Sequence, residues 1–213
     1  MSIVANLLLS KGLFINPIIR GLHDFGDCVM AQEENKRNPI KLFHHMAIDV
    51  SNMEESINFY RELLGYKLTE RHAASEVEAI PVELSFLRIH ENHHDLVLSH
   101  TPGKKYRARS KQDNIEGTTL HHHIAWECQD RDAWLEMLDR VKEMGLEIIR
   151  GPVVHSPYDP RGDGSWGENE SFYVFDPDGH RLEIFCDMAS IDKDGTFRSF
   201  GGQRIEEAKV IEN

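Results

Sequence analysis

The strongest constraint on the fold is an internal repeat. The stretch HHMAIDVSN at 44–52 matches HHIAWECQD at 122–130, since each begins with a histidine pair and continues with alternating apolar residues. Each copy is followed by a helix-like pattern and then by strand-like segments. Because such a repeat is one supersecondary unit used twice, we predict two βαβββ modules, at 42–101 and 120–188.

Helix and strand signals agree with this duplication. Ser51 or Asn52 can cap a helix in the first module, and Asp130 or Asp132 can cap one in the second. The strand-like segments are VELSFLRI and HDLVLSH in the first module, and LEIIRG, SFYVFD and HRLEIFC in the second. The predicted fold class is α+β, with paired βαβββ modules that form a curved mixed sheet around a central cavity.

Both modules are expected to form a single domain, 42–188. Three further segments complete the predicted organisation: an N-terminal extension at 1–41, a basic linker at 102–119 and a C-terminal tail at 189–213.

Composition narrows the partners. The chain carries 36 acidic and 24 basic side chains, a net charge of −12, which argues against nucleic acid or an anionic membrane as the main partner. No apolar run reaches membrane-spanning length, and the apolar start lacks the charged segment and cleavage site of a signal peptide. Cys28, Cys128 and Cys186 have neither disulfide-framework nor zinc-knuckle spacing, so we expect a reducing, cytoplasmic location.

Strand alternation shows where three ligand-type side chains point. In three predicted strands the apolar residues alternate towards the helix side, which leaves His45, His123 and Glu183 on the opposite face. If the two sheets curve around a shared cavity, these side chains converge and can bind one metal ion. The alternative is a solvated sheet face without a function. We assign that alternative to the other strand-end histidines, His44, His121 and His122.

Two longer motifs carry a family resemblance. HHMAIDVSNMEESINFYRELLGY and FDPDGHRLEIF resemble the start and the end of modules in the vicinal oxygen chelate superfamily. That superfamily includes glyoxalase I, bleomycin-resistance proteins, fosfomycin-resistance transferases and type I extradiol dioxygenases. The resemblance covers about residues 42 to 188, and it implies the paired-module fold and a divalent metal.

The ligand set favours one branch of this superfamily. Two histidines and a glutamate form the facial triad that suits Fe(II), with Mn(II) as the alternative, because positions stay open for substrate and O2. Glyoxalase I uses a fourth protein ligand, usually a glutamate on the last strand of the other module. In this chain that strand reads HDLVLSH and offers no glutamate, which argues against glyoxalase chemistry.

Further residues resemble the second set of active-site residues of extradiol dioxygenases. His94 precedes Asp95 ahead of an apolar strand, His155 ends a GPVVH loop, and Tyr173 lies ten residues before Glu183. The resemblance implies that His94 is the acid–base residue, and that His155 and Tyr173 hydrogen-bond the bound substrate. The loop at 156–172 is longer than is usual in the family, which leaves the shape of the substrate pocket open.

The expected function is therefore an Fe(II)-dependent extradiol dioxygenase that cleaves a catechol-type ring with O2, working as a homo-oligomer. A metal-dependent thiol or glutathione transferase of the fosfomycin-resistance type and a non-catalytic sequestering module are the alternatives. Arg161 or Arg198 could pair with a carboxylate on the ring, although loop arginines are more commonly just solvated.

Overall fold

The computed structural model describes residues 39–76, 78–106, 121–165 and 167–199, with 202, 204 and 205. The chain divides into two compact units, Met1–Leu42 and Phe43–Asn213. Of the first unit only residues 39–42 are described, and they form neither helix nor strand. Nearly all of the predicted N-terminal extension, most of the basic linker and the end of the tail lie outside the described residues, as does Cys28.

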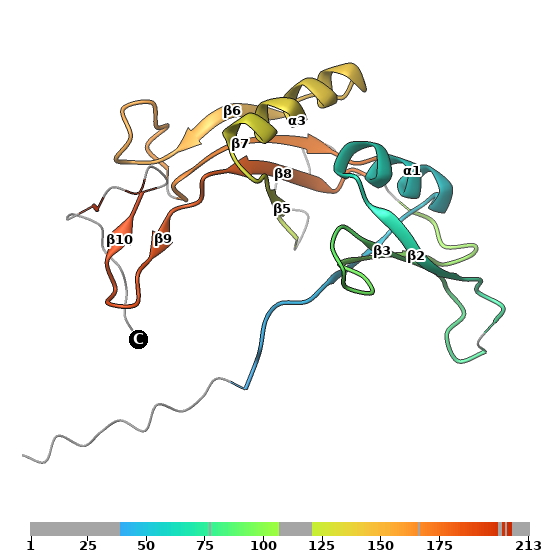
Figure 1. The fold of residues 1–213 in the computed structure, drawn as a ribbon. Helices are drawn as coiled ribbons and strands as arrows, with labels where there is room; N and C mark the ends of the chain where they lie inside the picture. The colour runs from blue at the N-terminus through green and yellow to red at the C-terminus, as the bar shows by residue number, and fades with distance from the viewer. Residues whose placement is uncertain are drawn as a thin grey trace, which may run out of the picture. The chain divides into compact units, whose positions relative to one another are not determined.

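The first module is a four-stranded mixed sheet with one helix (Figure 1). Its sheet has the order β1-β4-β3-β2, in which β1 runs parallel to β4 and the other neighbours are antiparallel. Its elements are β1 (Met46–Asp49), α1 (Met53–Leu64), β2 (Lys67–His72), β3 (Glu83–Arg88) and β4 (Leu96–His100).

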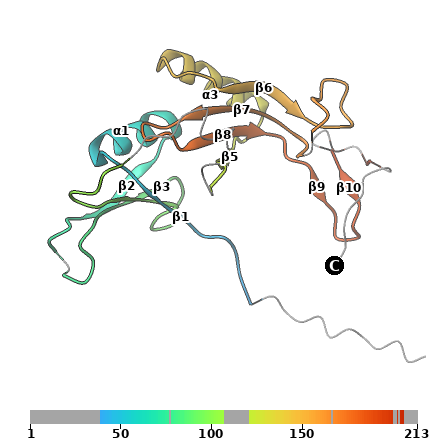
Figure 2. The ribbon, with the colours of Figure 1, turned by 180° about the vertical axis from the view of Figure 1, so that it is seen from behind.

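The second module repeats this topology. Its sheet has the order β5-β8-β7-β6, again with one parallel pair, β5 and β8. Its elements are β5 (Ile124–Glu127), α3 (Arg131–Glu143), β6 (Arg150–His155), β7 (Asn169–Phe175) and β8 (Arg181–Cys186). A short hairpin of β9 (Ser190–Ile191) and β10 (Phe197–Arg198) follows β8, as the view from behind also shows (Figure 2).

The predicted α+β class with two βαβββ modules is confirmed. One detail differs, because the described strands form two separate four-stranded sheets and do not close into one around a cavity. Backbone hydrogen bonding pairs strands within each module and leaves β1 and β5 as edge strands. Residues that face away from the helices are therefore grouped by module.

Both helices lie where the local sequence signals predicted them, and the structure resolves the capping choices that the sequence left open. Asn52 caps α1, where its side-chain oxygen accepts a hydrogen bond from the Glu55 N–H at 3.2 Å. Asp130 caps α3 in the same way, through the Ala133 N–H at 2.8 Å. At the end of α1, Gly65 adopts a left-handed φ of 73°, a conformation that glycine adopts without steric cost.

Two strands differ from the prediction. β2 was not among the predicted strands, because KLTERH is polar and almost wholly exposed and so has no apolar face to signal it. LEIIRG at 146–151 was predicted as a strand, but β6 begins only at Arg150 and continues through the GPVVH segment predicted as a loop. The register shifts between Arg150 and Val153, and such a bulge accommodates Pro152, which cannot donate to the ladder.

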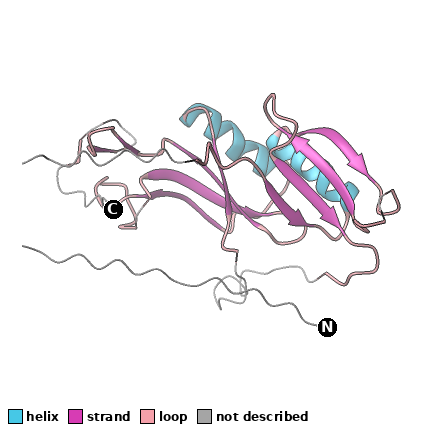
Figure 3. Cartoon of the chain, turned by 90° about the horizontal axis from the view of Figure 1, so that it is seen from below, coloured by secondary structure: helices cyan, strands magenta, loops and turns pink. Residues whose placement is uncertain are grey.

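One hydrophobic core runs through both modules. α1 packs on β4 and α3 packs on β8, and both helices lie on the same side of the strands (Figure 3). Hydrogen bonds also join the modules. Among them, Trp126 Nε1 donates to the Tyr66 hydroxyl at 3.0 Å, and the Tyr60 hydroxyl donates to Asp176 at 2.9 Å. Within the described part of the chain, no helix has the length and apolar character needed to cross a membrane.

Candidate metal and substrate site

Three side chains of the second module meet on the sheet face opposite α3. His123 lies just before β5, and its Nε2 is 2.9 Å from Oε2 of Glu183. The Tyr173 hydroxyl donates a hydrogen bond to the other carboxylate oxygen, Oε1, at 2.8 Å. Glu183 is only 5% exposed, so a carboxylate is buried on this face and each of its oxygens has a partner.

The hydrogen bonds decide the protonation of this pair. Burial acts to raise the pKa of Glu183, but the hydrogen bonds from His123 and Tyr173 outweigh it, so the pKa lies below its ordinary value. Burial, and next the hydrogen bond to Glu183, raise the pKa of Tyr173 to about 12. At neutral pH the site therefore holds a carboxylate beside a protonated phenol that donates to it.

His155 extends this arrangement. Its Nε2 lies 2.9 Å from the Tyr173 hydroxyl, and its Nδ1 lies 2.8 Å from Ser165 Oγ and 3.2 Å from Asp163 Oδ2. The Tyr173 hydroxyl already donates to Glu183, and the Ser165 hydroxyl donates to Asp163. Because the Tyr173 hydroxyl donates to Glu183, His155 Nε2 is the donor in its bond to that hydroxyl, while Nδ1 faces Ser165 and Asp163.

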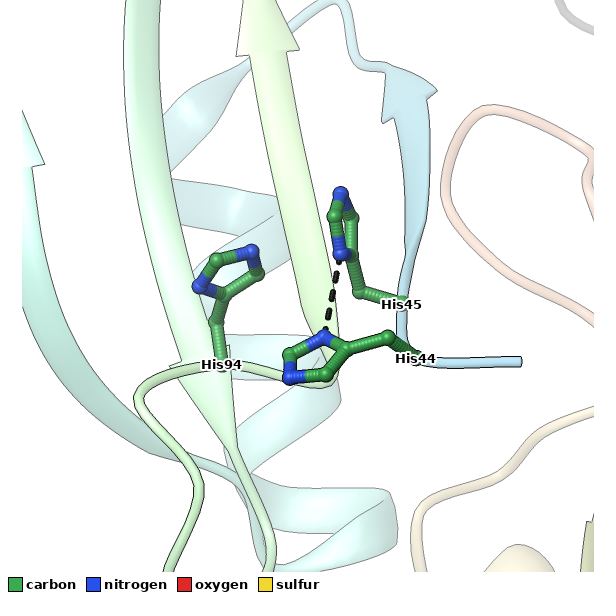
Figure 4. A group of neighbouring side chains, drawn as sticks. All are labelled: His44, His45 and His94. Atoms are coloured by element: carbon green, nitrogen blue, oxygen red, sulfur yellow. Dashed lines mark hydrogen bonds between the residues drawn. The ribbon is translucent and has the colours of Figure 1, made fainter. Parts of the chain in front are cut away.

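The first module contributes a separate group of histidines (Figure 4). The ligand nitrogens of His44, His45 and His94 all lie within 4.8 Å of one another, and the rings of His45 and His94 are 4.4 Å apart. Burial lowers the pKa of His94, and neighbouring histidines, first among them His45, lower it further. His44 is exposed, as expected for a strand-end histidine, but its ring belongs to this group.

The structure therefore brings the predicted site residues together in two sets. His123, Glu183, Tyr173 and His155 form one hydrogen-bonded set, whereas His45 lies beside His94. Among the described residues, the one group of three ligand atoms is the histidine group of the first module. The convergence of His45 with His123 and Glu183 on one metal stays a prediction.

Sequence reasoning missed Arg181 and underrated His122. The Arg181 guanidinium carbon lies 4.2 Å from the centre of the Tyr173 ring, and its Nη1 donates to His122 Nε2 at 3.1 Å. Burial, and next the charge of Arg181, lower the pKa of His122, which suits a neutral ring that accepts this bond. The sequence did contain a signal for Arg181, because residues two apart on a strand share a face and Arg181 is two residues from Glu183.

The two arginines considered for a ring carboxylate are engaged elsewhere. Arg161 pairs with Asp159 at 3.1 Å and lies 3.8 Å from Glu170. Arg198 pairs with Asp192 at 2.6 Å within the β9–β10 hairpin. Both therefore already have carboxylate partners of their own.

Known proteins place the chain in a family. Residues 42–184 match the model of the Glyoxalase/Bleomycin resistance protein/Dioxygenase superfamily. A lactoylglutathione lyase of Neisseria meningitidis is 30% identical over 147 residues, which cover 68% of this chain and 89% of that protein. "Glyoxylase I 4" of Arabidopsis thaliana is 24% identical over 163 residues, covering 75% and 79% of the two chains.

A solved structure supports the fold. The glyoxylase/bleomycin resistance protein/dioxygenase domain from Frankia sp. EAN1pec superposes with a TM-score of 0.53 at 14% identity. The match covers 69% of this chain and 98% of that domain. At this identity the likeness concerns the fold alone.

Proposed function

The chain belongs to the glyoxalase/bleomycin resistance protein/dioxygenase superfamily, and within it we propose that this protein is an Fe(II)-dependent extradiol dioxygenase acting on a catechol-type ring. Mn(II) is the alternative metal, because the ligand types do not discriminate strongly between the two. The observation that carries the proposal is the hydrogen-bonded series from His155 through Tyr173 to Glu183. This series places two hydrogen-bond donors, His155 and Tyr173, beside a buried carboxylate. Ring cleavage needs such donors, whereas a protein that only sequesters a small molecule does not.

The donor set fits a divalent metal. His123 and Glu183 present Nε2 and Oε2 to each other at 2.9 Å, and Tyr173 holds the second carboxylate oxygen, as residues around a metal site commonly hold a ligand in place. With His45 these residues would complete a set of two imidazoles and one carboxylate. Bound iron would supply a template that brings catechol and O2 together.

The protein's own residues would then manage charge and protons. Tyr173 is protonated at neutral pH, and its one proton, which is hydrogen-bonded to Glu183 in this structure, would turn to a substrate oxygen and stabilise negative charge there. The His155 ring, held by Asp163 and Ser165, points its Nε2 to the same place and adds a second donor. His94, beside His45, would accept and return the substrate proton.

The metal site would need His45 to meet the set on the second module. The interactions of His45 in the described structure are with His44 and His94. We propose that a homo-oligomer completes the site, with His45 of one copy facing His123 and Glu183 of a second copy. We call His45 on the first module one half-site, and His123 with Glu183 on the second module the other. Because β1 and β5 are edge strands of separate sheets, each half-site lies on its own sheet, which is consistent with completion by a second chain.

A glyoxalase I activity is the second candidate, because the relative that is 30% identical is a lactoylglutathione lyase. The strand register argues against it. Ala125 pairs with Glu183 in the second module, and the equivalent Ala47 pairs with Val97 in the first. Valine therefore occupies the position from which a fourth ligand would come.

The test is a paired assay of the full chain loaded anaerobically with Fe(II). We expect O2 uptake that depends on added catechol, with a yellow ring-opened product, and no isomerisation of the methylglyoxal–glutathione adduct. Isomerisation without O2 uptake would replace the proposal by the lyase. Thiol addition to fosfomycin without O2 uptake would replace it by the transferase, and binding without any turnover would replace it by the sequestering module.

A further inference from the structure

Arg181 lies in the proposed site without a carboxylate partner among the described residues. Its guanidinium stacks on the Tyr173 ring at 4.2 Å, and its Nη1 donates to His122. Its Nε is buried and has no hydrogen-bond acceptor within the described part of the chain. A buried charged donor without an acceptor costs free energy, and a ligand oxygen that came within reach would remove that cost.

Three other arginines of the described structure are each paired with a carboxylate. Arg150 pairs with Asp163 at 2.9 Å, Arg131 with Glu170 at 2.8 Å and Arg198 with Asp192 at 2.6 Å. Glu183 is the nearest acid along the strand from Arg181, but its two oxygens are engaged by His123 and Tyr173. His122 accepts a hydrogen bond from Arg181 at 3.1 Å, but an imidazole nitrogen that accepts this bond is not a carboxylate partner for the guanidinium.

Two arginine side chains approach the ring of Tyr173, Arg181 at 4.2 Å and Arg150 at 6.0 Å. Arg150 is paired with Asp163, so Arg181 is the one of the two whose charge has no carboxylate partner among the described residues. An unpaired arginine is also well suited to carboxylates, because its planar fork can donate two parallel hydrogen bonds.

We propose that Arg181 binds a carboxylate group on the substrate, so that the substrate is an anionic aromatic acid and not a neutral ring. The inference rests on the proposed function for the identity of the ring. Arg181 and Glu183 are two residues apart on one face of β8, a spacing of about 6.6 Å along a strand. The hydroxyl and carboxylate oxygens on opposite sides of a benzoic acid ring are a comparable distance apart, so the hydroxyls can lie by Glu183 while the carboxylate reaches Arg181.

The first test compares two catechols on the Fe(II)-loaded full chain without O2, by calorimetric titration. We expect 3,4-dihydroxybenzoate to bind at least about tenfold more tightly than the neutral 4-methylcatechol. Arg181→Gln should lose that preference and leave the affinity for 4-methylcatechol within about twofold, while Arg181→Lys should restore part of it. Arg198→Gln is the matched control, because it removes an arginine that is paired on the separate hairpin. An equal loss for both catechols, or no preference in the unaltered protein, would overturn the inference.

The second test needs neither metal nor turnover. Benzoate and benzyl alcohol are titrated into the metal-free chain and followed by NMR shifts, with Arg181→Gln alongside. Benzoate binding that disappears in Arg181→Gln supports the inference even if ring cleavage is never seen. Ring cleavage without any benzoate preference supports the proposed function and sinks the carboxylate site. Binding of phenylphosphonate but not benzoate would also overturn the assignment.

Discussion

The two modules share a strand register but carry different chemistry on it. In the second module Tyr173 pairs with Glu183, and at the same place in the first module Phe86 pairs with Val97. The second module thus has a hydroxyl and a carboxylate at two positions where the first module has apolar side chains. The fold tolerates both versions because these side chains face away from the helix-packed core.

The first module contributes histidines in place of a carboxylate. His45 stands at the position equivalent to His123, and His44 and His94 lie close to it. The comparison teaches that duplication supplied two copies of a histidine-bearing strand, and that only the second copy carries the carboxylate–phenol pair. We infer that one complete site needs a half from each module.

We expect the largest loss of activity from replacing the histidine that both modules carry at equivalent positions, His45 and His123. His123→Ala should abolish metal binding and lower turnover by about a thousandfold or more, because it removes a ligand that touches Glu183. Metal content of the purified protein and catechol-dependent O2 uptake measure this. Circular dichroism should be unchanged, since His123 lies outside the hydrophobic core. His72→Ala, which removes a partly exposed histidine of β2, is the control. A His123→Ala protein that keeps its metal would contradict the assignment.

Mixing two inactive variants tests the division between half-sites. His45→Ala and Glu183→Ala should each be inactive alone, and co-refolded they should regain about a quarter of the normal turnover, because half of the dimers then hold one intact site of two. The measurement is O2 uptake after co-refolding, with each variant refolded alone as the control. If one chain can close its own site, the mixture stays inactive and the proposal of completion by a second copy fails.

His94→Ala removes the first module's proposed acid–base residue. Turnover should fall by about a hundredfold or more, while iron content and anaerobic catechol affinity stay near normal, because a proton-transfer residue acts after binding. The exposed His90 offers a control substitution to alanine in the same connection. Normal turnover in His94→Ala would reduce this residue to a neighbour of His45.

Exchanging the residue types of Tyr173 and Phe86 tests what the phenolic oxygen contributes to the difference between the modules. Tyr173→Phe makes the second module resemble the first and should lower turnover by about tenfold to a thousandfold with the metal retained, since one donor to developing charge is lost. The reciprocal Phe86→Tyr should leave turnover unchanged, because its partner on β4 is Val97, which offers no carboxylate where Glu183 stands in the second module. Equal behaviour of the two variants would mean that Tyr173 serves only to pack.

The smallest effect concerns the junction of the modules. Tyr66→Phe removes the acceptor for the Trp126 indole and should lower the free energy of unfolding by about 1 kcal/mol. Urea denaturation followed by tryptophan fluorescence measures the change, and turnover at saturating substrate should stay the same. A much larger loss would show that the modules depend on this bond for their packing.

Local patterns in the sequence were enough to predict the helix starts, the strand faces and the two modules. Caps near Asn52 and Asp130 and the period-2 alternation around His123 and Glu183 depend on neighbours in the chain, so they could be identified from the sequence. The duplication likewise predicted both modules. The ordered motif around His155 and Tyr173 supplied candidates for the site, but not their contacts.

Tertiary structure decided what depends on distant partners. The polar strand β2 forms because β3 offers it hydrogen bonds, not because of its own pattern. The bond from His155 to Tyr173, the stacking of Arg181 on that ring and the grouping of His45 with His94 all join segments that pair across strands or loops. Cross-strand register and sheet packing set these contacts, and neither can be read from local sequence, because each is fixed by long-range burial and hydrogen bonding.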